Sequence, residues 1–78
     1  MKFNRTQKEY RALNDFLRGE LKRQKISQSD LGYRLNLSHV AISKRLSGQT
    51  EWTVWELINV FEILNVEFDY GLRGMDRD

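Results

Sequence analysis

The chain lacks several residue types, and each absence narrows what the protein can be. Its 78 residues contain no cysteine and no proline. Without cysteine there is no disulfide framework, no thiolate nucleophile and no thiolate metal ligand. Glycine is sparse, with five residues, and together with the missing proline this favours helices over short strands and turns. The composition therefore predicts an all-α protein that depends on helix packing for its stability.

Long apolar runs are also absent. No segment approaches the roughly 18 apolar residues of a membrane span, and the N-terminal sequence MKFNRTQKEY is too polar for a signal peptide. We therefore expect a cytoplasmic protein. The single histidine, His39, has no partner at a spacing suited to a metal and no nucleophile to activate. We expect no bound metal, no cofactor and no enzymatic activity.

Charge is distributed unevenly over what the length predicts to be a single domain, residues 1–78. Residues 1–35 carry nine basic and four acidic side chains, and residues 36–48 add two basic ones. Residues 49–78 carry two basic and seven acidic side chains. The basic region predicts a surface that faces a polyanion, and the acidic region predicts a surface that is turned away from it. The alternative is a solvated surface of mixed charge.

The most informative segment is ISQSDLGYRLNLSHVAISKRLSG, residues 26–48. Ser27 and Ser38 each precede a short apolar run with helical spacing, and a serine hydroxyl there accepts a hydrogen bond from a backbone N–H of the first turn. Between the runs, Asn36 tolerates the left-handed conformation of a sharp turn. Leu37 can then point back between the two helices. Two short helices joined by such a turn predict a helix-turn-helix over about 28–47.

Apolar residues recur at spacings of three and four over most of the chain. The Thr6–Glu9 spacing predicts a capping box for the first helix. Thr53 is expected to cap the fourth helix, and Asn65 is expected to end it. We expect the apolar faces to be Tyr10, Leu13, Phe16, Leu17 and Leu21 on the first helix and Val54, Leu57, Ile58, Phe61 and Leu64 on the fourth. The expected helices cover 5–25, 28–35, 39–47, 54–64 and 67–72, with residues 1–4 and 73–78 expected to be disordered.

These residues resemble the lambda-repressor and Cro-like helix-turn-helix family, the XRE-type regulators. The resemblance covers about residues 12–70 and rests on Ile26-Ser27-Gln28, Leu31, Asn36-Leu37-Ser38, Ile42-Ser43 and Gly48. It implies a compact bundle of about five short helices that binds double-stranded DNA sequence-specifically. The chain departs from the family pattern at Gly32, where alanine is usual and either residue should allow a close helix approach, at Arg45, where many members have a core aliphatic residue, and at Trp52 and Trp55.

The second helix of the motif would read DNA, because its first turns reach base edges in the major groove. Lys44 can donate to guanine, and Val40 can pack on a thymine methyl group. The expected base-reading residues are His39, Val40, Ala41, Ser43 and Lys44. The expected phosphate contacts are Gln28, which matches the family's phosphate-contacting glutamine, with Ser27, Lys25, Arg23, Arg45, Gln49 and Thr50. For Ser43, Lys44 and Arg45 the alternative is a solvent-exposed residue without a role in binding.

Aromatic residues gather in the acidic C-terminal third. Aromatic side chains are enriched at the centres of interfaces. We therefore predict a homodimer contact formed by Trp52, Trp55, Phe68 and Tyr70. Two-fold symmetry would then set two recognition helices about 34 Å apart, one turn of DNA. The alternative is that the tryptophans fill the core, which we expect of one of them.

The sequence thus favours a small phage- or mobile-element-type repressor that binds a palindromic operator as a dimer. The alternative is a protein-interaction module or antitoxin, whose acidic aromatic C-terminal third binds a partner protein. The basic first half argues against this alternative.

Overall fold

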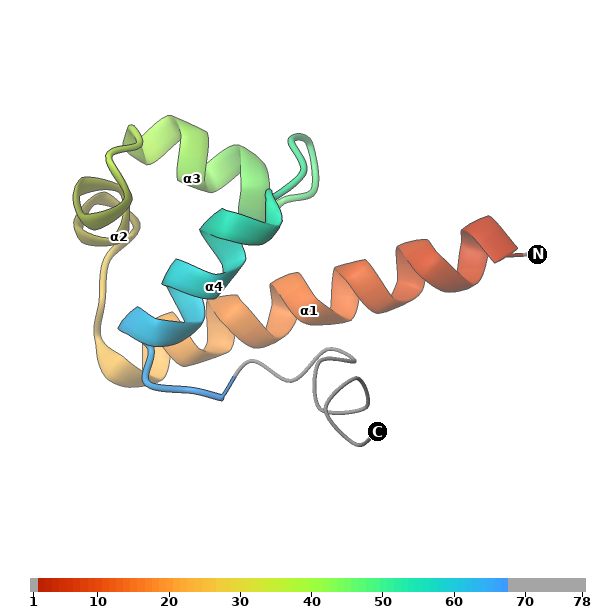
Figure 1. The fold of residues 1–78 in the computed structure, drawn as a ribbon, viewed down its shortest axis with the longest axis horizontal. Coiled ribbons are helices and arrows are strands. Elements are labelled where there is room, and N and C mark those ends of the chain that lie inside the picture. The colour runs from red at the N-terminus through yellow and green to blue at the C-terminus, as the bar shows by residue number, and fades with distance from the viewer. Residues whose placement is uncertain (1, 68–78) are drawn as a thin grey trace, which may run out of the picture.

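Four helices make up the described region of the chain. The computed structural model describes residues 2–67, with side chains from Gln7 onward. The helices are α1 (Lys2–Gln24), α2 (Gln28–Leu35), α3 (His39–Leu46) and α4 (Val54–Ile63), and residues 2–67 contain no strand. The prediction of an all-α fold is confirmed for these residues. In Figure 1, α1 is the long base of the molecule, and the other helices gather over its C-terminal half.

The N-terminal end of the chain differs from the prediction, and most of the predictions for the C-terminal end lie outside the described residues. Helix α1 begins at Lys2, so the disorder predicted for residues 1–4 is wrong for residues 2–4, and Thr6 lies inside the helix rather than at its cap. The predicted fifth helix at 67–72 falls outside the described residues, except for residue 67. The predicted disorder at 73–78, together with Phe68 and Tyr70, also lies outside them. None of the helices within residues 2–67 combines the length and the apolar character needed to cross a membrane.

Hydroxyl caps begin the three short helices, as predicted. Ser27 accepts a hydrogen bond from the Asp30 N–H at 3.0 Å, and Ser38 accepts one from the Ala41 N–H at 3.0 Å. At α4, Thr53 and Glu56 form a complete capping box, in which each side chain accepts a hydrogen bond from the other's backbone N–H. These bonds satisfy N–H groups that have no partner inside the helix, so the local sequence sets where each helix starts.

The turn between α2 and α3 brings backbone against backbone. Asn36 has φ 60° and ψ 41°, the predicted left-handed conformation, and Leu37 packs against the core. The Leu37 N–H donates to the Gly32 carbonyl at 2.7 Å. A Cβ atom at Gly32 would lie 2.4 Å from the Leu37 carbonyl oxygen. The expectation that alanine fits this position as well as glycine is therefore wrong, because the backbone oxygen of a tight turn cannot move aside without displacing the turn.

The core forms where α1, α2, α3 and α4 meet. Its fully or almost fully buried residues are Leu17, Leu21, Leu31, Ile42, Leu46, Trp52, Val60, Phe61 and Leu64. The predicted apolar face of α4 is partly wrong, since Val54 and Ile58 are exposed and Val60 is fully buried. Helix α4 is turned so that Val60 and Leu64, one turn apart, face inward. Phe16 is also more exposed than predicted, although its ring stacks on Phe61 with centroids 6.2 Å apart.

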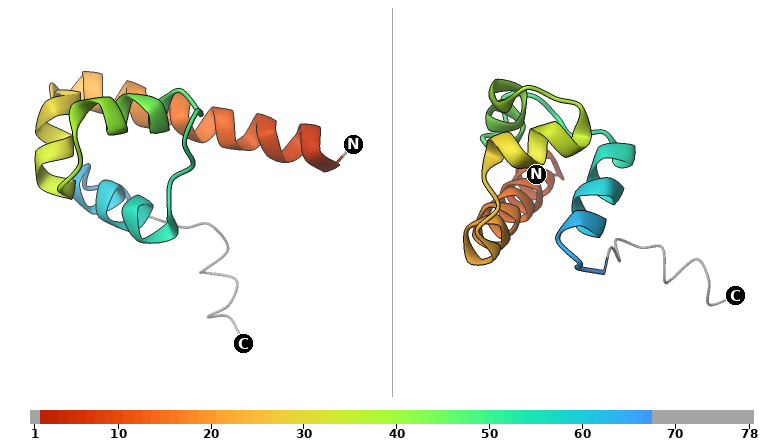
Figure 2. Two further views of the ribbon diagram at one scale, coloured as in Figure 1. Left: turned by 90° about the horizontal axis from the view of Figure 1, so that it is seen from above. Right: turned by 90° about the vertical axis from the view of Figure 1, so that its left-hand side faces the viewer.

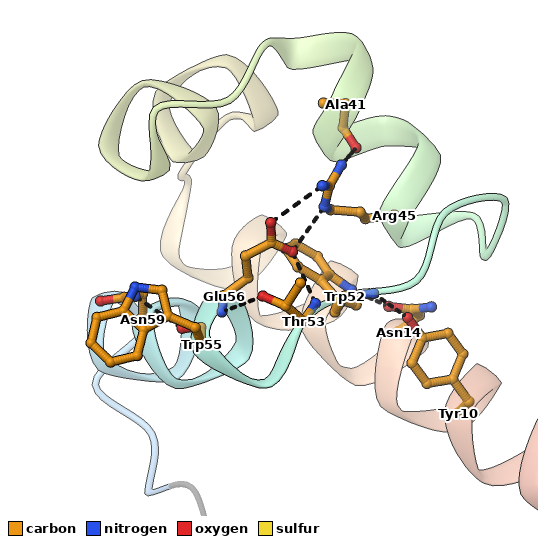
Figure 3. A network of polar contacts seen from close by, with 9 residues as sticks. All are labelled: Tyr10, Asn14, Ala41, Arg45, Trp52, Thr53, Trp55, Glu56 and Asn59. Atoms are coloured by element: carbon orange, nitrogen blue, oxygen red, sulfur yellow. Dashed lines mark hydrogen bonds and ion pairs between the residues drawn. The ribbon is translucent and has the colours of Figure 1, made fainter.

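Polar side chains of α1 hold the chain segment that leads into α4. The Trp52 backbone N–H donates to the Tyr10 hydroxyl at 2.7 Å, and its indole N–H donates to Asn14 Oδ1 at 2.8 Å (Figure 3). Asn14 is only 3% exposed, so this hydrogen bond satisfies two polar groups in the core. Trp52 therefore fixes the loop after α3 onto α1.

Two further side chains of α1 bind the last carbonyls of other helices. Arg18 donates to the Leu46 carbonyl at the end of α3. Gln24 donates to the Leu64 carbonyl, at the end of α4, at 2.8 Å. Since the last carbonyls of a helix lack partners within it, both bonds stabilise helix ends and fix α3 and α4 relative to α1.

Candidate nucleic-acid interface

Helix α3 turns one face to the core and the other outward. Ile42 and Leu46 are buried, whereas His39, Val40, Ser43 and Lys44 are exposed, and Ala41 is half-buried at the edge of the outer face. The structure thus brings the five expected base-reading residues to the accessible side of one helix. This division follows from the sequence, because Ile42 and Leu46 lie four residues apart and share the inner face.

The arrangement of α2 and α3 leaves that outer face uncovered. The two helices cross steeply (Figure 1), and α1 and α4 lie on the inner side of α3 (Figure 2). The N-termini of both helices carry serine caps in extended conformation. A helix presented in this way has the shape that fits the major groove, which is about 12 Å wide.

The segment from the end of α1 to the start of α2 carries four of the expected phosphate contacts. Arg23, Lys25 and Ser27 are exposed and Gln28 is half-buried. Lys25 has φ 60°, a left-handed conformation that the sequence did not suggest. Arg23 pairs with Glu20 at 2.7 Å, and hydrogen bonds from Arg23 and Gln24 lower the pKa of Glu20.

The loop after α3 carries two more expected contacts. Gln49 is exposed and Thr50 is half-buried. Their backbone N–H groups both donate to the Lys44 carbonyl, at 2.9 and 3.2 Å. This fixes the loop against the C-terminal end of α3, so the Gln49 side chain projects from an ordered backbone.

Arg45 does not belong to this surface, and its prediction as a phosphate contact is corrected. Its Nε and Nη2 donate to the two carboxylate oxygens of Glu56 at 3.0 and 3.2 Å, and its Nη1 donates to the Ala41 carbonyl at 3.1 Å (Figure 3). The side chains of Arg45 and Glu56 are 15% and 18% exposed. The guanidinium therefore joins α3 to α4 through an ion pair and is not available to a phosphate.

Glu56 caps the start of α4 and also accepts hydrogen bonds from Arg45 of α3. Burial opposes its ionisation, but hydrogen bonds from Arg45 and Thr53 outweigh this and hold the pKa of Glu56 below its ordinary value. The Thr53–Glu56 capping box could have been found from the T-x-x-E spacing. The bond to Arg45 could not, because the two residues are 11 positions apart and meet only where α3 and α4 cross.

The two tryptophans have opposite environments. Trp52 is 7% exposed and belongs to the core, whereas Trp55 is 74% exposed. The expectation that one tryptophan is in the core is confirmed, and the assignment of Trp52 to a dimer interface is wrong, because its indole is buried against α1. Trp55 lies with Val54 and Ile58 on the exposed side of α4. We call these three residues the α4 apolar patch.

No family model, curated protein or solved structure matches the chain. The resemblance to helix-turn-helix proteins therefore rests on the sequence motif alone.

Proposed function

We propose that the protein is a sequence-specific, double-stranded DNA-binding transcriptional regulator of the lambda-repressor-like kind. The observation that carries the proposal is the outer face of α3. It exposes His39, Val40, Ser43 and Lys44 on a helix whose other face is anchored by Ile42 and Leu46. Such a rigidly held helix can enter the major groove and keep its side chains in register with the base pairs.

The chemistry of this face suits base recognition. Lys44 has no salt bridge within the described residues, so its ammonium group is free to donate to guanine O6 and N7. Val40 offers an apolar contact for a thymine methyl group, and His39 can donate or accept a hydrogen bond. The α3 sequence contains no acidic residue, so nothing on the helix itself repels the DNA.

The start of α2 supplies a position for a backbone phosphate. Gln28 is the first residue of α2, directly after the Ser27 cap. The unpaired N–H groups and the positive end of a helix favour an anion there, and the Gln28 amide can donate to the same phosphate oxygen. Contacts of this kind set the orientation of the protein on the duplex, while α3 reads the sequence.

We further propose that the protein acts as a homodimeric repressor on a palindromic operator, with the α4 apolar patch at the dimer contact. The patch places a 74% exposed indole, Trp55, on a helix separate from the proposed DNA-reading face. The same exposure favours a second candidate function, in which the patch binds a different protein, as in an antitoxin. The two candidate functions predict different results for the purified protein alone, because only the homodimeric repressor is expected to select a two-fold-symmetric DNA site.

The test is selection of genomic fragments by the purified protein at about 0.15 M salt, where non-specific binding is weak. A short two-fold-symmetric motif supports the dimeric regulator. A single half-site keeps DNA binding and removes the dimer, and no enrichment contradicts the proposal and turns attention to a protein partner of the α4 apolar patch.

On the selected site, Lys44→Ala is expected to weaken binding by about 1–3 kcal/mol and to relax the preference at one base position. The measurement is the affinity for the site and its single-base variants. Lys8→Ala is the control, because Lys8 is an exposed cation on α1. Equal losses in both variants would mean that Lys44 contributes only charge.

A further inference from the structure

Two neighbouring clefts open along α1 and meet at Arg18. The first, of about 600 Å³, lies between α1 and the C-terminal end of α3, where Arg11, Arg18 and Ser47 line it. The second, of about 480 Å³, lies between α1 and the start of α2, where Arg18, Lys22 and Gln28 line it. Both clefts therefore open at an end of the helix-turn-helix, one after α3 and one before α2.

The walls of both clefts are rich in positive charge. Arg11 and Lys22 are exposed and have no salt bridge within the described residues. The lining contains one acidic residue, Asp15, and its carboxylate is paired with Arg18. Arg18 also donates to the Leu46 carbonyl, so it is fixed in place between the two free cations.

The three cations form a line on one side of α1. Arg11 and Lys22 are 11 residues apart, which is close to three helical turns and about 16 Å along the axis. We call Arg11, Arg18 and Lys22 the α1 strip. On α1, Phe16 faces elsewhere, against Phe61 of α4, so the α1 strip and α4 lie on different sides of the helix.

We propose that the α1 strip binds the phosphodiester backbone of the same DNA duplex that α3 reads. This rests on the proposed function. One strand of the duplex carries a phosphate for every 3.4 Å or so of its axis, so a strip about 16 Å long can reach more than one phosphate. The shared lining with Ser27, Gln28 and Ser47 makes the strip continuous with the helix-turn-helix. Arg18 positions the strip, and Arg11 and Lys22 contact the phosphates.

Duplex DNA fits the strip better than a single strand does. Proteins that hold single strands stack bases on exposed aromatic rings. The only aromatic side chain in the described lining is Tyr10, which is half-buried and whose hydroxyl accepts the Trp52 N–H. The clefts thus offer charge and polar groups without a stacking surface.

The test measures the salt dependence of binding by the full chain to the operator obtained by selection. The double variant Arg11→Gln with Lys22→Gln is compared with the control Lys8→Gln with Arg34→Gln, which removes the same charge from exposed positions outside both clefts. Each lost phosphate contact lowers the slope of log K against log salt by about 0.9. We expect a slope lower by about 1.8 and, at 0.15 M salt, affinity about 30-fold weaker for the strip variant.

The outcomes separate this inference from the proposed function. The preference for the operator over a scrambled duplex should be retained by the strip variant, because α3 is untouched. If the strip variant and the control change the slope equally, the proposal that the α1 strip binds the DNA backbone is overturned, while the DNA-reading role proposed for α3 stands. A strip variant with the slope of the unmodified protein overturns it as well. If the unmodified protein binds no DNA at all, both proposals fall, and circular dichroism of each variant shows whether it is folded.

Discussion

Replacing Gly32 by alanine tests how tightly α2 and the turn to α3 are packed. The added Cβ would lie 2.4 Å from the Leu37 carbonyl oxygen and 3.3 Å from both Ile42 Cγ1 and the Ser38 carbonyl oxygen. Two of these three neighbours are backbone atoms, which cannot rotate away as a side chain can. Either α2 or the turn must move, and such movement also shifts the start of α3.

The expected magnitude follows from a comparison with Gly19, the matched control. Gly19 lies in α1, and a Cβ atom there would meet nothing within 4 Å. Gly19→Ala should therefore stabilise the protein by about 0.5–1 kcal/mol, the ordinary gain of alanine over glycine in a helix. Gly32→Ala has the same gain but also overpacks a close contact, which costs about 1–3 kcal/mol. The two variants should differ by that cost.

Thermal unfolding followed by far-ultraviolet circular dichroism measures this difference. At about 4–8 °C for each kcal/mol in a domain of this size, Gly19→Ala should raise the Tm by several degrees and Gly32→Ala should leave it clearly below that of Gly19→Ala. If both substitutions raise the Tm equally, the contact between α2 and the turn is looser than the structure shows, and the packing argument for Gly32 fails.

Two other predictions concern the polar contacts of the core. The folded-state pKa of Glu56 is below its ordinary value of 4.5, so its carboxylate stabilises the fold above that pH, and the contribution is lost as the pH falls through the folded-state value. Glu56→Gln should therefore lower the free energy of unfolding by about 1–3 kcal/mol at pH 7 and by progressively less toward pH 3, as measured by urea unfolding. A difference between the two proteins that does not change with pH would refute the role of the Arg45–Glu56 pair. Asn14→Ala leaves the Trp52 indole N–H without its partner and should cost about 1–3 kcal/mol, whereas Asp15→Ala, at an exposed neighbouring position, should cost less in the same assay.

Short-range sequence signals were sufficient for the starts of α2, α3 and α4 and for the turn between α2 and α3. Ser27, Ser38 and Thr53 cap the helices where predicted, and Asn36 has the predicted left-handed conformation. The caps depend on bonds between residues three positions apart, and the turn on the conformation of one residue, so the local sequence determines them. The inward face of α3 was predictable for the same reason, since a spacing of four defines one side of a helix.

The start of α1 and the face of α4 were not predictable in this way. Residues 1–4 were expected to be disordered, yet α1 begins at Lys2. On α4, seven of the ten residues are apolar and they are spread around most of the helix, so the periodicity did not decide which side is buried. Packing against Phe16 and the core selected Val60 and Phe61 and left Val54 exposed.

By itself, the sequence determined an all-α chain with a helix-turn-helix whose outer face carries His39, Val40, Ser43 and Lys44. Only the tertiary structure decided which of the other polar and aromatic residues remain available for binding. It placed Arg45 against Glu56 and buried Trp52 on α1, while it left Trp55 and the α1 strip accessible. The physical reason is distance along the chain. The Arg45–Glu56 contact joins residues 11 positions apart and the Asn14–Trp52 contact joins residues 38 apart. Such contacts depend on how whole helices cross, and no local pattern encodes that crossing.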